Sequence, residues 1–286
     1  MSSVVVLGAG GMLGQDLMEV LAPQNPRGLT RDDVDITSSH QVGEAVHGVD
    51  IVINAAAYTH VDAAESDDDT AFQVNAVGAG IVADACREEG ARLIHVSTDY
   101  VFGGEATVPY PEDHPRDPQS AYGRTKAAGE ERVLSAHPDK SILIRTAWLY
   151  GEHGPNFVST MLALAASRDS VSVVTDQVGQ PTWSKDLARM IAALADSSVT
   201  SGIFHGTNAG QASWWEFARA IYTHAGLDPE RVLPTNSAEF VRPAPRPAWS
   251  VLGHHQWSAH NLLEPRSWQE AFDEAWSEVF SQRAKT

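Results

Sequence analysis

Hydrophobic residues in the first half of the chain gather in short runs that are separated by longer amphipathic stretches. Runs rich in β-branched residues occur at residues 4–7, 51–53, 93–98 and 141–145, and a shorter run lies near residues 28–30. Such runs are typical of strands that are buried on both faces of a parallel sheet. Helical spacing follows at residues 12–21 and 65–89 and from Tyr122 onwards, and a short polar helix is expected after residue 37. This alternation predicts an α/β fold with a doubly wound parallel sheet.

The alternation loosens after residue 150, where prolines become more frequent. The sequence predicts helices at residues 156–167, 185–195 and 213–224, a strand at residues 171–174 and a loop at residues 177–182. Ser213 and Glu216 form a capping box that opens the third of these helices. We therefore expect a dinucleotide-binding domain at residues 1–150, to which residues 185–208 contribute. Residues 151–286 are expected to form mainly a smaller C-terminal α/β lobe that binds substrate.

A glycine-rich turn connects the first predicted strand to the first predicted helix. Its glycines include Gly8, Gly11 and Gly14. A turn without side chains lets backbone N–H groups at the start of a helix approach the pyrophosphate of a dinucleotide. An ordinary tight turn would also use glycine, but the position between an N-terminal strand and a helix favours a Rossmann-type dinucleotide site.

The residues after the second and third predicted strands bear on the cofactor. The acidic residue that usually contacts the adenosine ribose is replaced by Thr30 and Arg31, and a guanidinium suits the 2′-phosphate of NADPH. Acidic residues follow closely at 32, 33 and 35, so the pattern favours NADPH and leaves NADH open. Residues 54–59 are mostly small, which lets a flat cofactor lie against the backbone at the end of the third strand.

Composition restricts the class of protein. The 286 residues include 37 acidic and 20 basic ones, giving a formal charge of -17, which argues against binding to nucleic acid. The single cysteine, Cys86, cannot form an internal disulfide, and the chain shows neither a leader pattern nor an apolar run long enough to span a membrane. The histidines lack metal-ligand spacing, which makes a zinc site unexpected. These features predict a cytoplasmic enzyme.

Tyr122 and Lys126 are four residues apart, which places both side chains on one face of a helix. A phenol ordinarily loses its proton near pH 10, and a nearby ammonium group lowers that pKa towards neutrality. The alternative is a coincidence on a solvated helix. The chain contains only 4 lysines, however, so we interpret the pair as a catalytic acid and base.

Other polar residues are expected to support this pair. Ser97 and Thr98 end the fourth predicted strand, and only one of them can face the tyrosine because neighbouring strand residues point to opposite faces. Asn75 lies on an apolar helix face and is expected to hold neighbouring backbone groups together. Arg242 and Arg246 are interspersed with three prolines, and a chain of this charge needs a local cation to bind a phosphate. We favour Arg246 for that role, with Arg242 as its rival.

Several of these motifs together resemble the extended short-chain dehydrogenase/reductases. The motifs are the glycine turn, residues 54–59, residues 97–102 and the segment from Tyr122 to Lys126. Further segments at residues 61–65, 145–148, 176–182 and 246–247 are similar to those of the dTDP-4-dehydrorhamnose reductase family, and the similarity extends nearly end to end.

This resemblance implies reduction of the 4-keto group of dTDP-4-dehydro-β-L-rhamnose to dTDP-L-rhamnose by NADPH or NADH. It implies Thr98, Tyr122 and Lys126 as the catalytic set. The expected cofactor-binding residues are Gly8, Gly11, Met12, Leu13, Arg31, Asp35, Ile36, Ala55, Ala56, Ala57, Tyr58, Thr59, Tyr122 and Lys126. The expected substrate-binding residues are Thr98, Asp99, Trp148 and Arg246.

Two other functions stay open at this point. A sister reductase acting on a related dTDP-keto sugar, as in the dihydrostreptose branch of aminoglycoside synthesis, would share every motif. A non-catalytic relative, similar to the regulatory subunit of methionine adenosyltransferase, would bind NADP and a protein partner, but the set of Thr98, Tyr122 and Lys126 argues against it. Some family members bind magnesium between subunits. Only Asp16 aligns with the acidic residues involved, so no metal ligand is assigned, and a homodimer stays open.

Overall fold

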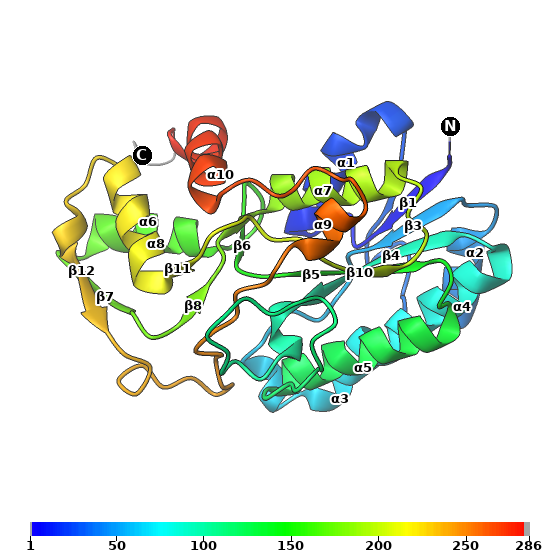
Figure 1. The fold of residues 1–286 in the computed structure, drawn as a ribbon, viewed down its shortest axis with the longest axis horizontal. Helices are drawn as coiled ribbons and strands as arrows, with labels where there is room; N and C mark the ends of the chain where they lie inside the picture. The colour runs from blue at the N-terminus through cyan, green and yellow to red at the C-terminus, as the bar shows by residue number, and fades with distance from the viewer. Residues whose placement is uncertain (1, 283–286) are drawn as a thin grey trace.

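A six-stranded sheet forms the centre of the computed structural model, which describes residues 2–282 (Figure 1). All of its neighbouring strands are parallel, and their order is β10-β5-β4-β3-β1-β2. The strands are β1 (Val4–Leu7), β2 (Arg27–Leu29), β3 (Ile51–Asn54), β4 (Arg92–Thr98), β5 (Ser141–Thr146) and β10 (Gly202–His205). Every residue of β1, β3 and β5 is buried, as expected for strands covered on both faces.

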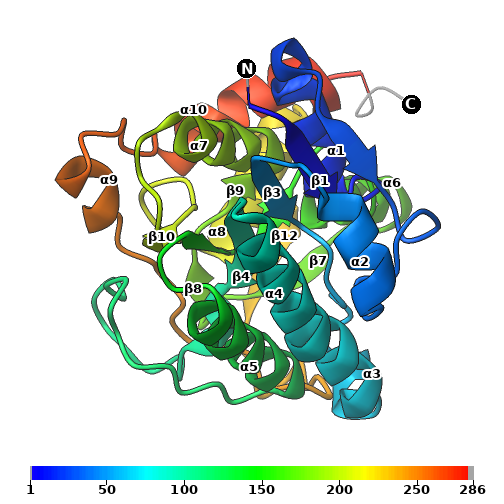
Figure 2. The same ribbon diagram turned by 90° about the vertical axis from the view of Figure 1, so that its right-hand side faces the viewer.

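Helices cover both faces of this sheet. On one face, α1 (Met12–Val20) and α7 (Ser184–Asp196) bury leucines and isoleucines against the sheet. On the other face lie α2 (Ser39–Val46), α4 (Ala79–Glu89) and α5 (Ala121–Ala136). Figure 2 shows α7 above the sheet and α4 and α5 below it. The doubly wound α/β fold predicted from the sequence is therefore confirmed.

The strand order reverses between β1 and β3. The chain runs from β1 outward to β2, and it then returns to place β3 on the opposite side of β1. Loops that leave two adjacent strands in opposite directions open a crevice at the carboxyl edge of the sheet, where such folds bind ligands.

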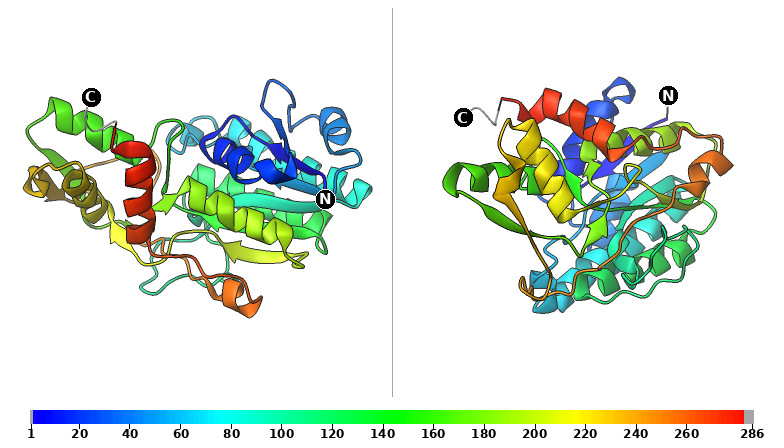
Figure 3. Two further views of the ribbon diagram at one scale, coloured as in Figure 1. Left: turned by 90° about the horizontal axis from the view of Figure 1, so that it is seen from above. Right: turned by 60° about the vertical axis from the view of Figure 1, so that its left-hand side comes forward.

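The remaining elements form a smaller unit beside the sheet (Figure 3). Its strands are β6 (Leu149–Tyr150), β7 (Val171–Val174), β8 (Val178–Gly179), β9 (Thr182–Trp183), β11 (Ala212–Ser213) and β12 (Val232–Thr235). Its helices are α6 (Phe157–Ser167), α8 (Trp214–His224) and α10 (Trp268–Ala275), and the short α9 (His255–Ala259) returns to the sheet. Aromatic side chains, among them Tyr150, Trp183 and Phe217, fill the core of this unit.

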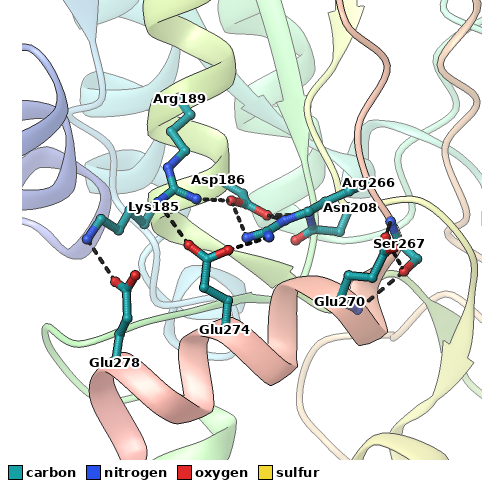
Figure 4. Close-up of polar contacts among 9 residues, drawn as sticks. All are labelled: Lys185, Asp186, Arg189, Asn208, Arg266, Ser267, Glu270, Glu274 and Glu278. Atoms are coloured by element: carbon teal, nitrogen blue, oxygen red, sulfur yellow. Dashed lines mark hydrogen bonds and ion pairs between the residues drawn. The ribbon is translucent and has the colours of Figure 1, made fainter.

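A charged network ties α10 to α7 (Figure 4). The guanidinium of Arg266 binds both carboxylate oxygens of Asp186 at 2.7 and 2.9 Å and also pairs with Glu274. Arg189 pairs with the same two carboxylates, and Lys185 pairs with Glu278. The C-terminal helix is therefore attached to the sheet by ion pairs as well as by packing.

Most predicted elements agree with the structure within one or two residues. The capping box at Ser213 is present, with both of its hydrogen bonds. Two predictions were wrong. The helix expected over residues 65–89 is divided into a 3₁₀ turn, a short helix (α3, Asp68–Phe72), a π-helical segment (η3, Gln73–Gly78) and α4, and the loop expected at residues 177–182 contains β8. No helix within residues 2–282 has the length and apolar character needed to span a membrane.

Candidate functional site

A cavity of about 660 Å³ lies at the carboxyl ends of β1, β2 and β3. Glycines allow the backbone to form it. Gly8 has a φ of +85°, and a Cβ atom there would lie 2.7 Å from the backbone nitrogen of Ala56. A Cβ atom on Gly14 would lie 2.2 Å from the Gly8 carbonyl oxygen, so α1 could not begin so close to the turn. The turn thus presents bare backbone to the cavity, which fits the pyrophosphate of a dinucleotide.

Most of the cofactor-binding residues expected from the sequence line this cavity. They are Gly8, Gly11, Arg31, Asp35, Ile36, Ala55, Ala56, Ala57, Tyr58 and Thr59. Met12 and Leu13 are not among the lining residues, and the Leu13 side chain packs in the core between the sheet and α7. Tyr122 and Lys126 also lie outside the lining. Tyr58 packs in one cluster with Tyr122 and so connects the cavity to the candidate catalytic pair.

The acidic residues after β2 have partners of their own. Asp33 accepts hydrogen bonds from the Thr30 backbone and hydroxyl at 2.8 and 2.7 Å. Asp35 accepts equivalent bonds from Thr37, which together with the nearby Arg31 lower its pKa. Arg31 is exposed at the rim of the cavity and makes no such contact with Asp33. Its guanidinium is thus accessible to an anionic group in the cavity.

Thr98 and Tyr122 meet at the end of β4. Ser120 caps the N-terminus of α5 by accepting a hydrogen bond from the backbone of Gly123, and this places Tyr122 in the first helical turn. The Thr98 hydroxyl lies close enough to the phenol of Tyr122 to affect its pKa, and it donates a hydrogen bond to Asp99 at 2.9 Å. Ser97 points to the opposite side and donates to Glu130 at 2.6 Å. The prediction that only one of the two hydroxyls faces the tyrosine is therefore confirmed.

The expected effect of Lys126 on Tyr122 is not found. Burial raises the pKa of Tyr122 above its ordinary value, and the neighbouring Thr98 hydroxyl opposes this rise only in part. Lys126 Nζ instead donates to the Val96 carbonyl at 2.7 Å and lies 3.5 Å from His95 Nε2. The prediction was wrong because helical spacing says nothing of acceptors on β4, which hold the amine. Burial also lowers the pKa of Lys126 to about 8.

The residues expected to bind the sugar surround this pair. Asp99 is buried beside Thr98, and burial raises its pKa to about 6. Trp148 follows β5 with a φ of +47°, an unusual conformation for a residue with a side chain. Its ring stacks on Trp214, with 3.5 Å between the ring centroids and 7° between the planes. Trp214 also packs against the core of the smaller unit, and helical spacing over residues 213–224 gives no sign of its contact with Trp148.

Arg246 forms an ion pair within the protein. Its Nη2 atom lies 2.9 Å from Asp62 Oδ1, and Nη1 donates to the Ala244 carbonyl. It lines a second cavity of about 270 Å³ together with Tyr100. Tyr100 packs edge-on against Tyr122 with 5.6 Å between ring centroids. Arg242 is more exposed and lies 3.9 Å from Asp62, so Arg246 is the better placed of the two arginines.

Magnesium does not fit Asp16. This carboxylate is buried, and it accepts a hydrogen bond from Ser184 at the start of α7. Within residues 2–282, no group of three or more His, Cys, Asp or Glu side chains is arranged to hold a metal ion.

Asn75 shows why the helix before α4 is distorted. Its side chain accepts from the Tyr58 backbone N–H at 2.8 Å and donates to the Tyr58 carbonyl and to Thr125 at 3.1 Å. The predicted role of tying backbone groups together is therefore confirmed. The π-helical segment that carries Asn75 approaches α5 so closely that a Cβ atom on Gly129 would lie 2.1 Å from the Asn75 carbonyl oxygen.

Comparison with known proteins identifies the family. Residues 1–280 match the model of the RmlD substrate binding domain. The chain belongs to this family. It is 46% identical to dTDP-4-dehydrorhamnose reductase of Streptomyces griseus, over 95% of this chain and 92% of that protein.

Other relatives extend the comparison. The chain is 44% identical to dTDP-4-keto-6-deoxy-D-glucose reductase of Streptomyces niveus, over 95% of each chain. Among solved structures, dTDP-4-dehydrorhamnose reductase of Bacillus anthracis in complex with NADP is 39% identical, with a TM-score of 0.93 over 97% of this chain and 99% of that one. The resemblance inferred from the sequence motifs is thereby confirmed.

Proposed function

We propose that this protein uses NADPH or NADH to reduce the 4-keto group of dTDP-4-dehydro-β-L-rhamnose, giving dTDP-L-rhamnose. The pair formed by Thr98 and Tyr122 carries this proposal, because this hydroxyl and buried phenol lie together and Tyr58 connects the phenol to the cavity at the glycine turn. The support from relatives is the 46% identity to the Streptomyces griseus reductase over nearly the whole chain.

In this proposal Tyr122 is the general acid. A phenol whose pKa is near 10 or above is protonated at neutral pH, so Tyr122 has a proton available for the ketone oxygen. The O–H bond of the phenol breaks as an O–H bond forms on the product alcohol, and water restores the phenol. Thr98 lies beside the phenol, and its hydroxyl, which donates to Asp99 in the unliganded protein, would turn to donate a hydrogen bond to the ketone oxygen as negative charge develops there. A dihydronicotinamide held in the cavity at the glycine turn would supply the hydride for the ketone carbon.

We propose that Asp99 and Trp148 contact the sugar and that Arg246 contacts the diphosphate. Arg246 and Tyr100 share one cavity, and Tyr100 packs against Tyr122, so this cavity adjoins the reacting groups. The cavity at the glycine turn fits the cofactor. Arg31 at its rim favours NADPH, because only that dinucleotide carries a 2′-phosphate.

We propose that the two groups of packed elements bind different ligands. Residues 1–150, together with residues 185–208 that supply α7 and β10, would bind the dinucleotide, and residues 151–286 would mainly bind the sugar nucleotide. A cytoplasmic location is consistent with the single, buried and unpaired cysteine. A homodimer is also proposed, and light scattering on the purified protein would test it.

A second reductase activity has specific support. The Streptomyces niveus relative, which is named for a different dTDP-4-keto sugar, is 44% identical to this chain, almost as much as the Streptomyces griseus protein. Overall identity therefore does not separate the two substrates.

The assay follows consumption of NADPH by the purified chain with each of the two keto sugars. Turnover of dTDP-4-dehydrorhamnose should be faster, and Tyr122→Phe should slow it by about a hundredfold or more, because general acid catalysis contributes roughly 10²–10⁴. Tyr222→Phe is the matched control, since Tyr222 is buried in the second core and its hydroxyl has no hydrogen-bond partner within residues 2–282. Faster turnover of the other sugar would favour the second activity. Absence of turnover with both would contradict the proposed function.

A further inference from the structure

Three buried polar residues lie behind the candidate catalytic site. Asn54 of β3 and His95 of β4 are register partners in the parallel sheet, and Lys126 reaches His95 from α5. All three side chains are almost completely buried. Polar groups in the middle of a sheet core are costly unless every one is paired, so their hydrogen bonds determine one another.

The backbone fixes the orientation of Asn54. The N–H of Ala56 donates to Asn54 Oδ1 at 3.1 Å, and a backbone N–H can only donate. The opposite orientation of the amide would place two donors against each other at that distance. Asn54 Nδ2 must therefore be the atom that faces His95 Nδ1 at 3.2 Å, and it donates there.

This orientation selects the tautomer of His95. Burial and the neighbouring Lys126 hold the pKa of His95 well below its ordinary value, so the ring is neutral and carries one proton. Because Nδ1 accepts from Asn54, that proton resides on Nε2. Nε2 lies 3.5 Å from Lys126 Nζ. A neutral amine can accept from this N–H, whereas an ammonium would place a donor against a donor.

Other groups around Lys126 do not reproduce this effect. The Val96 carbonyl accepts from Nζ at 2.7 Å in either charge state. Glu130, one turn later on α5, favours the ammonium, but its carboxylate is paired with Arg145 of β5 at 2.8 Å and with Ser97 of β4. Tyr122, one turn earlier on α5, remains protonated because burial raises its pKa. The polar N–H of His95 is the donor that directly opposes a charge on the amine.

We propose that His95 is a positioning residue whose Nε2 proton, fixed by Asn54, favours the uncharged form of Lys126 and so sets the pH range in which the reductase works. This inference rests on the proposed function for its catalytic meaning. The ammonium form of Lys126 would stabilise the negative charge left on the phenol oxygen when Tyr122 gives up its proton, so the rate should fall at the pH at which Lys126 loses its charge. The series of hydrogen bonds from Lys126 through His95 and Asn54 ends at the Ala56 N–H, so His95 provides no path for protons to solvent.

Nuclear magnetic resonance tests the tautomer without any assay. Long-range ¹H–¹⁵N spectra of protein labelled at histidine, with the His95 signals identified by their loss in His95→Met, should show a neutral ring protonated at Nε2. A ring protonated at Nδ1 would overturn the proposal, even if the variant is too unstable for other work.

The charge state of Lys126 can be measured directly because the chain has only 4 lysines. A ¹³C titration of labelled lysine should give Lys126 a pKa near 8, rising by about 0.5 or more in His95→Met. His137→Gln is the control, since His137 is also buried but bonds to the Ala91 carbonyl far from Lys126. An unchanged or lower pKa in His95→Met would contradict the proposal.

The alkaline limb of kcat/KM should move upward with the Lys126 pKa in His95→Met and stay in place in His137→Gln. A purely structural role would lower the rate without moving the limb, and that result would overturn the proposal. If the wild-type protein lacked reductase activity, the proposed function would fail while both resonance measurements still decided the role of His95.

Discussion

One carboxylate oxygen of Asp99 is buried without a well-aligned hydrogen bond in the described part of the chain, and the nearby Ser250 hydroxyl offsets the effect of burial on its pKa only in part. The other oxygen accepts from Thr98. A buried carboxylate with a free oxygen is unfavourable in the unliganded protein, but it is well suited to accept a hydrogen bond from a hydroxyl of a bound sugar. We therefore expect Asp99 to lower the stability of the unliganded protein and to strengthen binding of the sugar.

Asp99→Asn should raise the melting temperature at pH 7. The pKa of Asp99 is about 6 in the folded protein and 3.8 as its ordinary value, so the folded state binds the proton more tightly. The stability that this provides is fully present below pH 3.8 and is lost as the pH rises through about 6. The gain from the substitution should therefore shrink in acid. Thermal unfolding between pH 4 and 8 measures it.

Asp33→Asn provides a control of opposite sign for that experiment. Hydrogen bonds from Thr30 lower the pKa of Asp33, so its charged form stabilises the fold and the substitution should lower the melting temperature at pH 7. A loss of stability in both Asp99→Asn and Asp33→Asn would show that the buried charge of Asp99 does not destabilise the fold.

Arg246→Ala should raise the KM for the sugar nucleotide by about tenfold, because charge-assisted hydrogen bonds contribute roughly 1.5–3 kcal/mol. The KM for NADPH should not change. Arg242→Ala is the control, since that arginine is half exposed and lies farther from Asp62. Equal effects of the two substitutions, or a defect confined to NADPH, would exclude a specific role for Arg246.

At this scale, the sequence predicted residue identities better than their interactions. Strand alternation predicted that only one of Ser97 and Thr98 faces Tyr122, and the family resemblance was needed to choose Thr98. The partner of Arg246 did not, because Asp62 is distant in sequence and only the folded chain brings the two together. The roles of Asn54 and His95 were also missed, although a polar residue within each buried strand run was a visible signal.

Among the elements, the turn after β5 has the most strained backbone in the site. Trp148 adopts a positive φ while its ring is held between Trp214 and the backbone of Gly179. Such a conformation persists only where the surroundings enforce it. The short segments β8 and α8 thus position the ring that is proposed to contact the sugar.

Gly179→Ala should displace that ring, because the added Cβ atom would lie 2.5 Å from Trp148 Cε2. We expect a rise of about tenfold or more in the KM for the sugar nucleotide, with little change in that for NADPH. Steady-state titration of each substrate measures both. Gly43→Ala on α2 is the control, because its Cβ would meet nothing within 4 Å and alanine favours helices. An unaffected sugar-nucleotide KM would show that the ring position does not matter for binding.

The interrupted helix before α4 shows what periodicity cannot predict. Apolar spacing over residues 65–89 indicated one helix, and most of these residues are indeed helical. The π-helical segment inside it depends on Asn75 reaching Tyr58 and Thr125, which belong to other elements. Tertiary hydrogen bonds therefore decide a local feature that the sequence pattern leaves undetermined.

For the whole molecule, the network between α7 and α10 is the main polar connection of the C-terminal helix (Figure 4). Asp186 is nearly buried, and Arg266 supplies two of its hydrogen bonds. Asn208 and Arg189 supply further bonds to this carboxylate.

Arg266→Ala should destabilise the protein by about 1–3 kcal/mol, because it removes two bonds from a buried carboxylate. Denaturant unfolding measures the loss. Arg219→Ala provides the comparison, since its partner Glu230 is largely exposed and such pairs contribute roughly 0–1 kcal/mol. A loss no larger than that in Arg219→Ala would mean that packing alone attaches α10.

The general organisation of the molecule followed from the sequence, including the sheet, the glycine turn and a second group of elements after residue 150. Residues 185–208 were expected to contribute to the dinucleotide-binding domain, but the loosened pattern could not show where their elements lie in it. Strand β10 adds to the edge of the sheet beside β5, and α7 covers one face, although both follow β6 to β9 in the chain. Only the register between strands distant in sequence determines that return.

The position of Trp257 has a consequence for how the chain is made. This residue of α9 is buried against the sheet, where it packs on Phe204 and donates to the His205 carbonyl at 2.8 Å. The core that covers β1 includes Trp257, so the ribosome synthesises β1 long before it adds the side chain that completes this core. Nascent chains that end before residue 257 should remain sensitive to protease and bound to chaperones, and the fold should close only as translation finishes.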